Sequence, residues 1–159
     1  MALNDDYISA LVTLAHACDR YRAMTGGEVV LVGGAATVLY TDGEFMSGDF
    51  DLVAAADGAF EAAMTEAGFK REDQIGYLLR GFYHPAHPGF GFEPVSGRLI
   101  DGKADVKRLR KVLMSGDAGI VLPSFEDMIA DRLGQHTAAS PTDDSRLLQA
   151  RCLFRLAKT

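Results

Sequence analysis

The chain has 159 residues, and 48% of them are hydrophobic, which is enough for one globular domain with a continuous core. A formal net charge of -6 and a pI near 5.1 argue against a general nucleic-acid-binding surface, because such binding depends on Lys and Arg neutralising phosphates. Two cysteines exclude a disulfide framework, and the absence of a signal-like or membrane-length apolar run predicts a cytoplasmic protein.

The first third of the chain predicts a helix, a strand, a short helix and a second strand. Apolar residues recur at helical spacing from Asp5 to about Met24 and predict an amphipathic helix. Residues 28–33 (EVVLVG) are apolar without polar alternation, which is typical of a strand covered on both faces. Two glycines end this strand and start a short helix through about Tyr40, and residues 49–54 are expected to form the second strand.

The rest of the chain is predicted to mix strands and helices. A helix is expected over residues 57–67, and strands are expected at 76–83, 90–95, 109–113 and 119–122. Ser124 is a candidate N-cap for a further helix, and a last helix follows from about Thr142. The pattern predicts a single α/β (α+β) domain over residues 1–159. Its mixed β-sheet core spans about 28–122, with flanking helices, and its C-terminal helical pair spans about 124–158.

The strongest functional signal is a pair of aspartates at alternate positions. Asp49 and Asp51 point to the same side of the second predicted strand. Two such carboxylates repel each other unless a cation lies between them, and their hard oxygens suit Mg²⁺, which usually brings phosphate oxygens as its other ligands. The sequence therefore predicts a magnesium site that also holds a phosphorylated substrate.

Upstream of the aspartates, Gly33 and Gly34 occupy the predicted strand-to-helix turn. Glycines there let an anion approach the unpaired N–H groups at the helix N-terminus. Together with the aspartates, this turn predicts a triphosphate site beside a metal, as attack on an α-phosphate with pyrophosphate leaving requires. The turn matches neither GxGxxG nor GxxxxGK[ST], so a Rossmann-like nucleotide binder is a distant alternative.

These motifs resemble the nucleotidyltransferase superfamily, in which a strand, a Gly-Gly or Gly-Ser turn into a helix and an Asp-x-Asp follow in this order. LVGGAA (31–36) and SGDFD (47–51) look especially like small bacterial nucleotidyltransferase-like proteins, some of them related to toxin components of toxin-antitoxin pairs. SFEDMIADRL (124–133) resembles their helix after the core, and the resemblance covers roughly residues 28–135. It implies Mg²⁺-dependent transfer of a nucleoside monophosphate from an NTP to a hydroxyl acceptor, which is RNA, protein or a small molecule.

The resemblance also implies a third carboxylate that helps hold the metal and accepts the proton of the attacking hydroxyl. Glu93 is the first choice because FGFEPV can lie beside the aspartate strand, and Asp101 is the next. Pro94 cannot donate a ladder hydrogen bond and favours an edge or a distortion, which would displace Glu93 from the inner strands. Relatives often carry an arginine shortly before the aspartates, where this chain has Phe45, so triphosphate binding would depend on another cation.

Other residues receive secondary predictions. Ser47 is a candidate contact to a phosphate oxygen. Lys and Arg residues within 103–111 form a basic run that could meet a triphosphate or an RNA acceptor, although a solvated face is favoured. For Arg132, ion pairs within its helix are favoured over substrate contact. His84 and His87 of HPAHP are interpreted as loop histidines rather than a metal pair.

A second functional hypothesis comes from another class. Phe45 and Pro94 both favour a catalytically degenerate nucleotidyltransferase fold that serves as a binding or regulatory module, paired with an antitoxin-like protein partner. Metal-dependent NTP binding without a product would distinguish this module from the enzyme.

Overall fold

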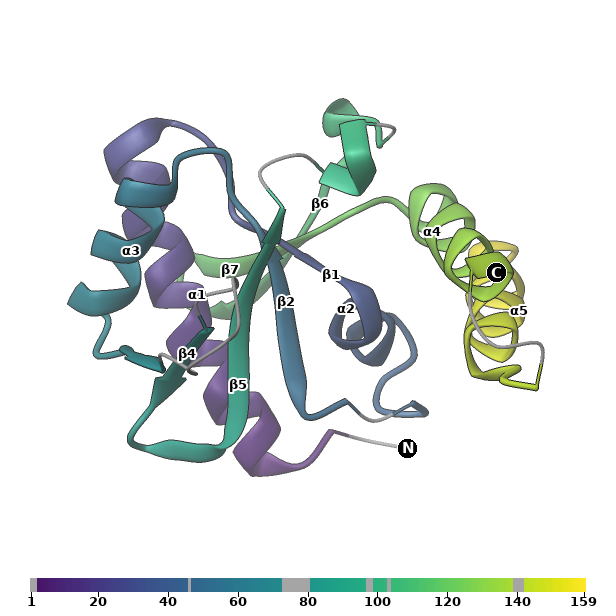
Figure 1. Cartoon of the computed structure of the whole chain (residues 1–159), viewed down its shortest axis with the longest axis horizontal. Helices are drawn as coiled ribbons and strands as arrows, with labels where there is room; N and C mark the ends of the chain where they lie inside the picture. Colours follow the sequence, from purple (N-terminus) through teal and green to yellow (C-terminus); the bar gives the residue numbers. More distant parts are fainter. Residues whose placement is uncertain (1–2, 46, 73–80, 97–98, 103, 139–141) are drawn as a thin grey trace.

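The structure is a computed structural model that describes residues 3–45, 47–72, 81–102, 104–138 and 142–159, apart from residues 97–98 (Figure 1). The described helices are α1 (Asp5–Thr25), α2 (Gly33–Tyr40), α3 (Asp57–Glu66), α4 (Phe125–Ala138) and α5 (Ser145–Ala157), with 3-10 turns η1 (Leu99–Gly102) and η2 (Val106–Arg108). The described strands are β1 (Val30–Val32), β2 (Asp49–Val53), β3 (Lys70–Glu72), β4 (Gly81–His84), β5 (His87–Ser96), β6 (Arg110–Ser115) and β7 (Ala118–Leu122).

All these strands join one mixed sheet in the order β3-β4-β5-β2-β1-β7-β6. The strand that carries the aspartates, β2, lies at the centre, antiparallel to β1 and parallel to β5. Helices α4 and α5 pack against each other and against α2, beside the sheet (Figure 1). The predicted α/β class, with a mixed sheet and a C-terminal helical pair, is confirmed.

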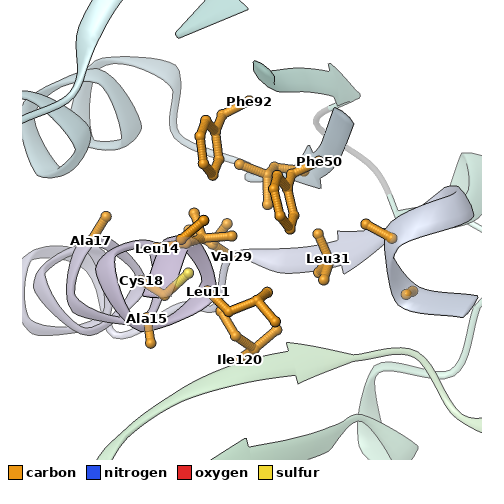
Figure 2. Packing of buried hydrophobic residues seen from close by; sticks show 14 of the residues in the cluster. Leu11, Leu14, Ala15, Ala17, Cys18, Val29, Leu31, Phe50, Phe92 and Ile120 are labelled. Atoms are coloured by element: carbon orange, nitrogen blue, oxygen red, sulfur yellow. The ribbon is translucent and has the colours of Figure 1, made fainter. Parts of the chain in front are cut away.

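Helix α1 begins and ends where its sequence signals lie. The Asn4 side chain accepts a hydrogen bond of 2.8 Å from the Tyr7 backbone N–H, and Gly26 closes the helix with φ of 73°. The buried side of α1 packs on the sheet, and Figure 2 shows Leu14 and Phe92 among the side chains of the shared buried cluster. Across β2 and β5, Phe50 stacks on Phe92 with 4.8 Å between ring centroids. These aromatic side chains make the face of the central sheet that packs against α1 apolar.

The other face of the central strands carries a smaller apolar cluster, formed by Val30, Val32, Val53, Leu99 and Val121. Its presence explains why β1 is buried at every position, as expected of a strand covered on both faces. Side chains alternate along β2, so Asp49 and Asp51 share this second face and point away from α1.

The HPAHP segment is a hairpin rather than the expected loop. His84 ends β4, His87 begins β5, and the two histidines pair across a two-residue turn. The turn is closed by the Ala86 backbone N–H, which donates to His84 Nδ1 at 3.1 Å. Pro85 suits this turn because its φ is already fixed, so the proline continues the pairing instead of interrupting it. Most of the strand predicted at 76–83 lies outside the described residues.

Pro94 does not move Glu93 out of the inner strands. It lies in β5, between β4 and β2, and Leu52 of β2 pairs with it. The register then shifts, so that Val53 pairs with Ser96. This bulge is the predicted distortion, and it accommodates a residue that cannot donate to the ladder. The predicted displacement was wrong, because the distortion begins only after Glu93.

No described helix combines the length and the apolar character needed to cross a lipid bilayer.

Candidate functional site

The site begins at the turn where β1 becomes α2. Val32 pairs with Asp51 of the antiparallel neighbour β2, so the first residue of α2 lies beside that aspartate. Gly33 has φ of 67°, a left-handed conformation that favours glycine. A Cβ added there would lie 2.8 Å from Asp51 Oδ2, closer than van der Waals contact permits. Glycine at this position therefore gives both the turn and the space for the carboxylate.

The second glycine of the turn faces Ser47. A Cβ at Gly34 would lie 3.3 Å from Ser47 Oγ, and the same hydroxyl donates a 3.1 Å hydrogen bond to the Asp49 carbonyl. The hydroxyl thus connects the turn to the start of β2. The three residues predicted to bind the nucleotide, Gly33, Gly34 and Ser47, therefore lie together beside the predicted metal ligand Asp51.

Asp49 lies at the start of β2 and its side chain is exposed. Its neighbour on β5 is Gly91, where an added Cβ would come within 2.9 Å of Asp49 Oδ1. The Asp49 carboxylate therefore lies over Gly91, and a side chain at position 91 would clash with it.

Glu93 stands directly opposite Asp51 on the parallel strand β5. Its side chain also borders β4, with Cγ 3.7 Å from the position of a Cβ at Gly81. The alternative third carboxylate, Asp101, belongs to η1, and its side chain lies outside the described part of the chain. The sheet register thus favours Glu93 as the partner of Asp51.

The pKa of Asp51 is raised above its usual range. Burial is the main cause, and the negative charges of Glu93 and then Asp49 add to it. The Arg132 guanidinium acts in the opposite direction and lowers the pKa. The carboxylates of Asp51, Glu93 and Asp49 are thus close together and repel one another. Binding of a divalent cation there would be favourable, because it would offset their repulsion.

A cavity of about 500 Å³ opens beside Asp51. On the sheet side it is lined by Gly33, Gly34, Ser47 and Asp51, and on the helical side by Asp131, Arg132, Gln135, Ser145, Arg146 and Gln149. Asp49 and Glu93 are not among its lining residues. The cavity therefore lies between the glycine turn and the α4–α5 pair, with the Asp51 carboxylate in its wall.

Arg132 is both an ion-pair residue and part of this cavity. Its Nε and Nη2 donate to Asp131 Oδ2, which confirms the predicted ion pair within the helix, while Nη1 donates to Gln149 of α5 at 3.4 Å. The side chain is buried. Its place in the cavity could not be inferred from helical spacing, because it depends on how α4 packs against α5. The same holds for Arg146, which also lines the cavity and which no local sequence pattern singles out.

The donor groups suit Mg²⁺, although they are not a closed cage. Among the described residues, no three His, Cys, Asp or Glu side chains are placed to hold a metal ion together. Magnesium is commonly held by one or two carboxylates, with waters and substrate phosphates as its remaining ligands. Asp49 and Asp51, at alternate positions of one strand, fit that requirement.

The remaining candidates lie away from this cavity. His87 Nε2 is 2.9 Å from Thr13 Oγ1, and His84 Nε2 is 3.3 Å from the Ala67 carbonyl, so both rings contact neighbouring elements. Within the basic run, the Arg110 guanidinium lies 5.4 Å from the centre of the Phe125 ring, and the run does not contribute to the lining beside Asp51. Lys103 lies outside the described residues.

Solved structures with a similar fold include three that cover nearly the whole chain. One is an antigenic nucleotidyltransferase-like protein from Paracoccidioides brasiliensis, with a TM-score of 0.68, 16% identity, and coverage of 98% of this chain and 78% of that one. A second is ANT(2")-Ia in complex with adenylyl-2"-tobramycin, with a TM-score of 0.59, 16% identity, and coverage of 92% and 88%. A third is the lincosamide antibiotic adenylyltransferase LnuA with lincomycin bound, with a TM-score of 0.51, 13% identity, and coverage of 98% and 99%.

Sequence comparison gives no match, either to a protein-family model or to a curated protein. The likeness is therefore one of fold, and it extends over nearly the whole chain in each case. Within this fold, the candidate site is formed by strand β1, the glycine turn into α2 and the aspartate strand β2. The chain has a nucleotidyltransferase-like fold.

Proposed function

We propose that the chain is a Mg²⁺-dependent nucleotidyltransferase that transfers a nucleoside monophosphate from an NTP to a hydroxyl acceptor. The observation that carries the proposal is the convergence of Gly33, Gly34 and Asp51 on one cavity of a nucleotidyltransferase fold. This convergence supplies an anion site at a helix N-terminus directly beside a carboxylate whose pKa is raised by burial and then by its acidic neighbours.

Each residue then has a defined task. Asp49 and Asp51 hold Mg²⁺, which when bound would neutralise charge on the phosphate oxygens and orient the leaving pyrophosphate. The backbone N–H groups of Gly33 and Gly34 bind the β- and γ-phosphates, and the Ser47 hydroxyl contributes a further donor at the same turn. Glycine is required in this role because a Cβ would meet the carboxylate or the hydroxyl.

The reaction is an attack by the acceptor hydroxyl oxygen on the α-phosphorus. A new bond forms between this oxygen and the phosphorus, the bond from the α-phosphorus to the oxygen bridging it to the β-phosphate breaks, and pyrophosphate leaves. The hydroxyl proton passes to the Glu93 carboxylate, which lies opposite Asp51 in the sheet and serves as the general base.

A small hydroxylated molecule is the proposed acceptor. Two proteins with a similar fold have been solved with antibiotic ligands: ANT(2")-Ia in complex with adenylyl-2"-tobramycin, and the lincosamide antibiotic adenylyltransferase LnuA with lincomycin bound. A cytoplasmic location, where NTP and Mg²⁺ are present, belongs to this proposal.

The test is titration calorimetry of the wild type with each of the four NTPs, with and without Mg²⁺, followed by an assay for pyrophosphate release. The same measurements are made on Asp49→Asn and Asp51→Asn. We expect binding that needs both Mg²⁺ and the aspartates, and pyrophosphate release that each substitution abolishes while circular dichroism stays unchanged. Unchanged pyrophosphate release in either variant would reject this mechanism.

One observation favours a second candidate, a degenerate module that binds nucleotide or an antitoxin-like protein without catalysis. Asp49 and Glu93 do not line the cavity, and no described triad of possible ligands is assembled around a metal position. Mg²⁺-dependent NTP binding with no pyrophosphate release, with any tested hydroxyl acceptor, would support this candidate instead of the enzyme.

A further inference from the structure

The wall of the cavity that faces the glycine turn carries two arginines. Arg132 comes from α4 and Arg146 from α5, the helical pair that lies beside α2 in Figure 1. Both line the same cavity as Gly33 and Gly34, the residues proposed to bind the β- and γ-phosphates. The cavity thus has an anion-binding turn on one side and guanidinium groups on the other.

Arg132 is held in place before any ligand arrives. Its side chain is buried, and three of its N–H groups donate to Asp131 and Gln149. A guanidinium has five N–H groups in a planar fork, so donors remain beyond these three bonds. Arg132 and the proposed metal ligand Asp51 line the same cavity, so the guanidinium borders the space beside that carboxylate.

Arg146 is held less firmly. Its side chain is 36% exposed, and it forms an ion pair of 3.5 Å with Asp143. Exposed pairs of this kind contribute little free energy, so the guanidinium can leave Asp143 for a stronger anion. A phosphate offers that anion, because two parallel N–H···O bonds to phosphate are stronger than a single long contact.

The cavity also needs positive charge if it is to hold a polyanion. Asp51 and Asp131 both line it, and their carboxylates would repel a triphosphate. Position 45, shortly before the aspartates, is a phenylalanine and supplies no charge. Cations must therefore come from another part of the chain, and the α4–α5 pair brings two of them to the cavity.

We propose that Arg132 and Arg146 are triphosphate-binding residues, which contact the β- and γ-phosphates of the NTP from the side opposite Gly33 and Gly34. This inference rests on the proposed function, because it takes the cavity to be an NTP site. It assigns to the C-terminal helical pair a direct role in nucleotide binding, with Arg132 fixed by Asp131 and Gln149 and Arg146 closing on the ligand.

The test uses inorganic tripolyphosphate and the NTP that the wild type binds, each with Mg²⁺, in titration calorimetry. Arg146→Gln is expected to weaken both about tenfold or more, as loss of a charge-assisted contact would. Its binding of the corresponding nucleoside monophosphate should stay unchanged, because that ligand lacks the β- and γ-phosphates. Arg151→Gln is the matched control, since Arg151 is an exposed arginine of the same helix that does not line the cavity.

Arg132 is tested by Arg132→Lys, which keeps the charge but loses the planar fork, with circular dichroism to confirm the fold. A severalfold loss of tripolyphosphate affinity in this variant, added to the result for Arg146→Gln, supports the inference. Wild-type affinity for tripolyphosphate in Arg146→Gln, while Asp51→Asn no longer binds NTP, would overturn the arginine roles and leave the proposed function standing. If the wild type binds neither NTP nor tripolyphosphate, both are wrong.

Discussion

The Asp51 carboxylate lies against the backbone of Gly33, with Oδ2 only 2.8 Å from where a Cβ would stand. The contact joins two motifs that are separated in the sequence by all of α2 and the loop after it. It arises because β1 and β2 are antiparallel, with Val32 opposite Asp51. The turn that would bind phosphates and the carboxylate that would bind metal therefore depend on each other.

Gly33→Ala is expected to damage both fold and site. The left-handed φ alone should lower the free energy of unfolding by about 1 to 2 kcal/mol, and the new methyl group must displace the Asp51 carboxylate. Urea denaturation measures the loss. Gly134→Ala is the control, because Gly134 lies inside α4 with open space around it. That change should raise the free energy of unfolding by up to about 1 kcal/mol. Equal stabilities for wild type and Gly33→Ala would contradict the geometry.

Gly91→Ala should affect the site without weakening the fold. An added Cβ would lie 2.9 Å from Asp49 Oδ1, so the carboxylate must shift. Because this side chain is exposed, it can shift without disturbing the core. Because a misplacement of about 1 Å can cost up to about a hundredfold in rate, kcat/KM for pyrophosphate release should fall by at least tenfold. Gly89→Ala, in the same strand with no atom near its Cβ position, should keep wild-type activity. Equal activities of the two variants would show that Asp49 does not need its observed position.

Asp51→Asn should stabilise the apo-protein at neutral pH. Because the pKa of Asp51 is raised in the folded state, that state binds more protons than the unfolded state between the ordinary value of 3.8 and the raised value. The contribution of this carboxyl to stability is therefore greatest at low pH and falls as the pH rises through this window. Asn removes the buried charge, so the variant should exceed the wild type in free energy of unfolding at pH 7.

The same comparison at low pH provides the control. Well below the ordinary pKa of 3.8 the wild-type carboxyl is protonated in both states, and the pH-dependent difference between Asp51→Asn and wild type should vanish. Urea denaturation without Mg²⁺, across this pH range, makes the measurement. A difference that is independent of pH would show that Asp51 does not titrate as its surroundings indicate.

A buried tyrosine, Tyr7, and a partly buried one, Tyr40, should respond differently to loss of the hydroxyl. The Tyr40 hydroxyl donates a hydrogen bond to the Pro123 carbonyl and so connects α2 to the segment just before α4. Burial raises the pKa of Tyr40 to about 12, so this hydroxyl stays protonated. Tyr40→Phe should lower the free energy of unfolding by about 1 kcal/mol. The Tyr7 hydroxyl is buried with no hydrogen-bond partner among the described residues. Tyr7→Phe should therefore leave stability unchanged or raise it by about 1 kcal/mol, as thermal or urea unfolding can show.

Local patterns were sufficient for much of the fold. Helix α1 is an example. Its apolar residues recur at helical spacing, and its cap Asn4 and its terminating Gly26 directly flank the helix in the sequence. The alternation in FGFEPV is likewise sufficient to place Phe92 and Glu93 on opposite faces of one strand. In HPAHP the local pattern is misleading, because it predicts a loop although a two-residue turn accommodates Pro85 within a hairpin.

The sequence by itself determined the glycine turn, the paired aspartates on one strand and the apolar surfaces of the central sheet, because these follow from spacing along a few consecutive residues. Only the tertiary structure decided that Glu93 faces Asp51, since strand order and register depend on contacts between distant segments. It likewise decided that Arg132 and Arg146 line the cavity beside Asp51. Helical periodicity can state which side of a helix is apolar, but the position of that helix relative to the sheet is set by packing across the whole core.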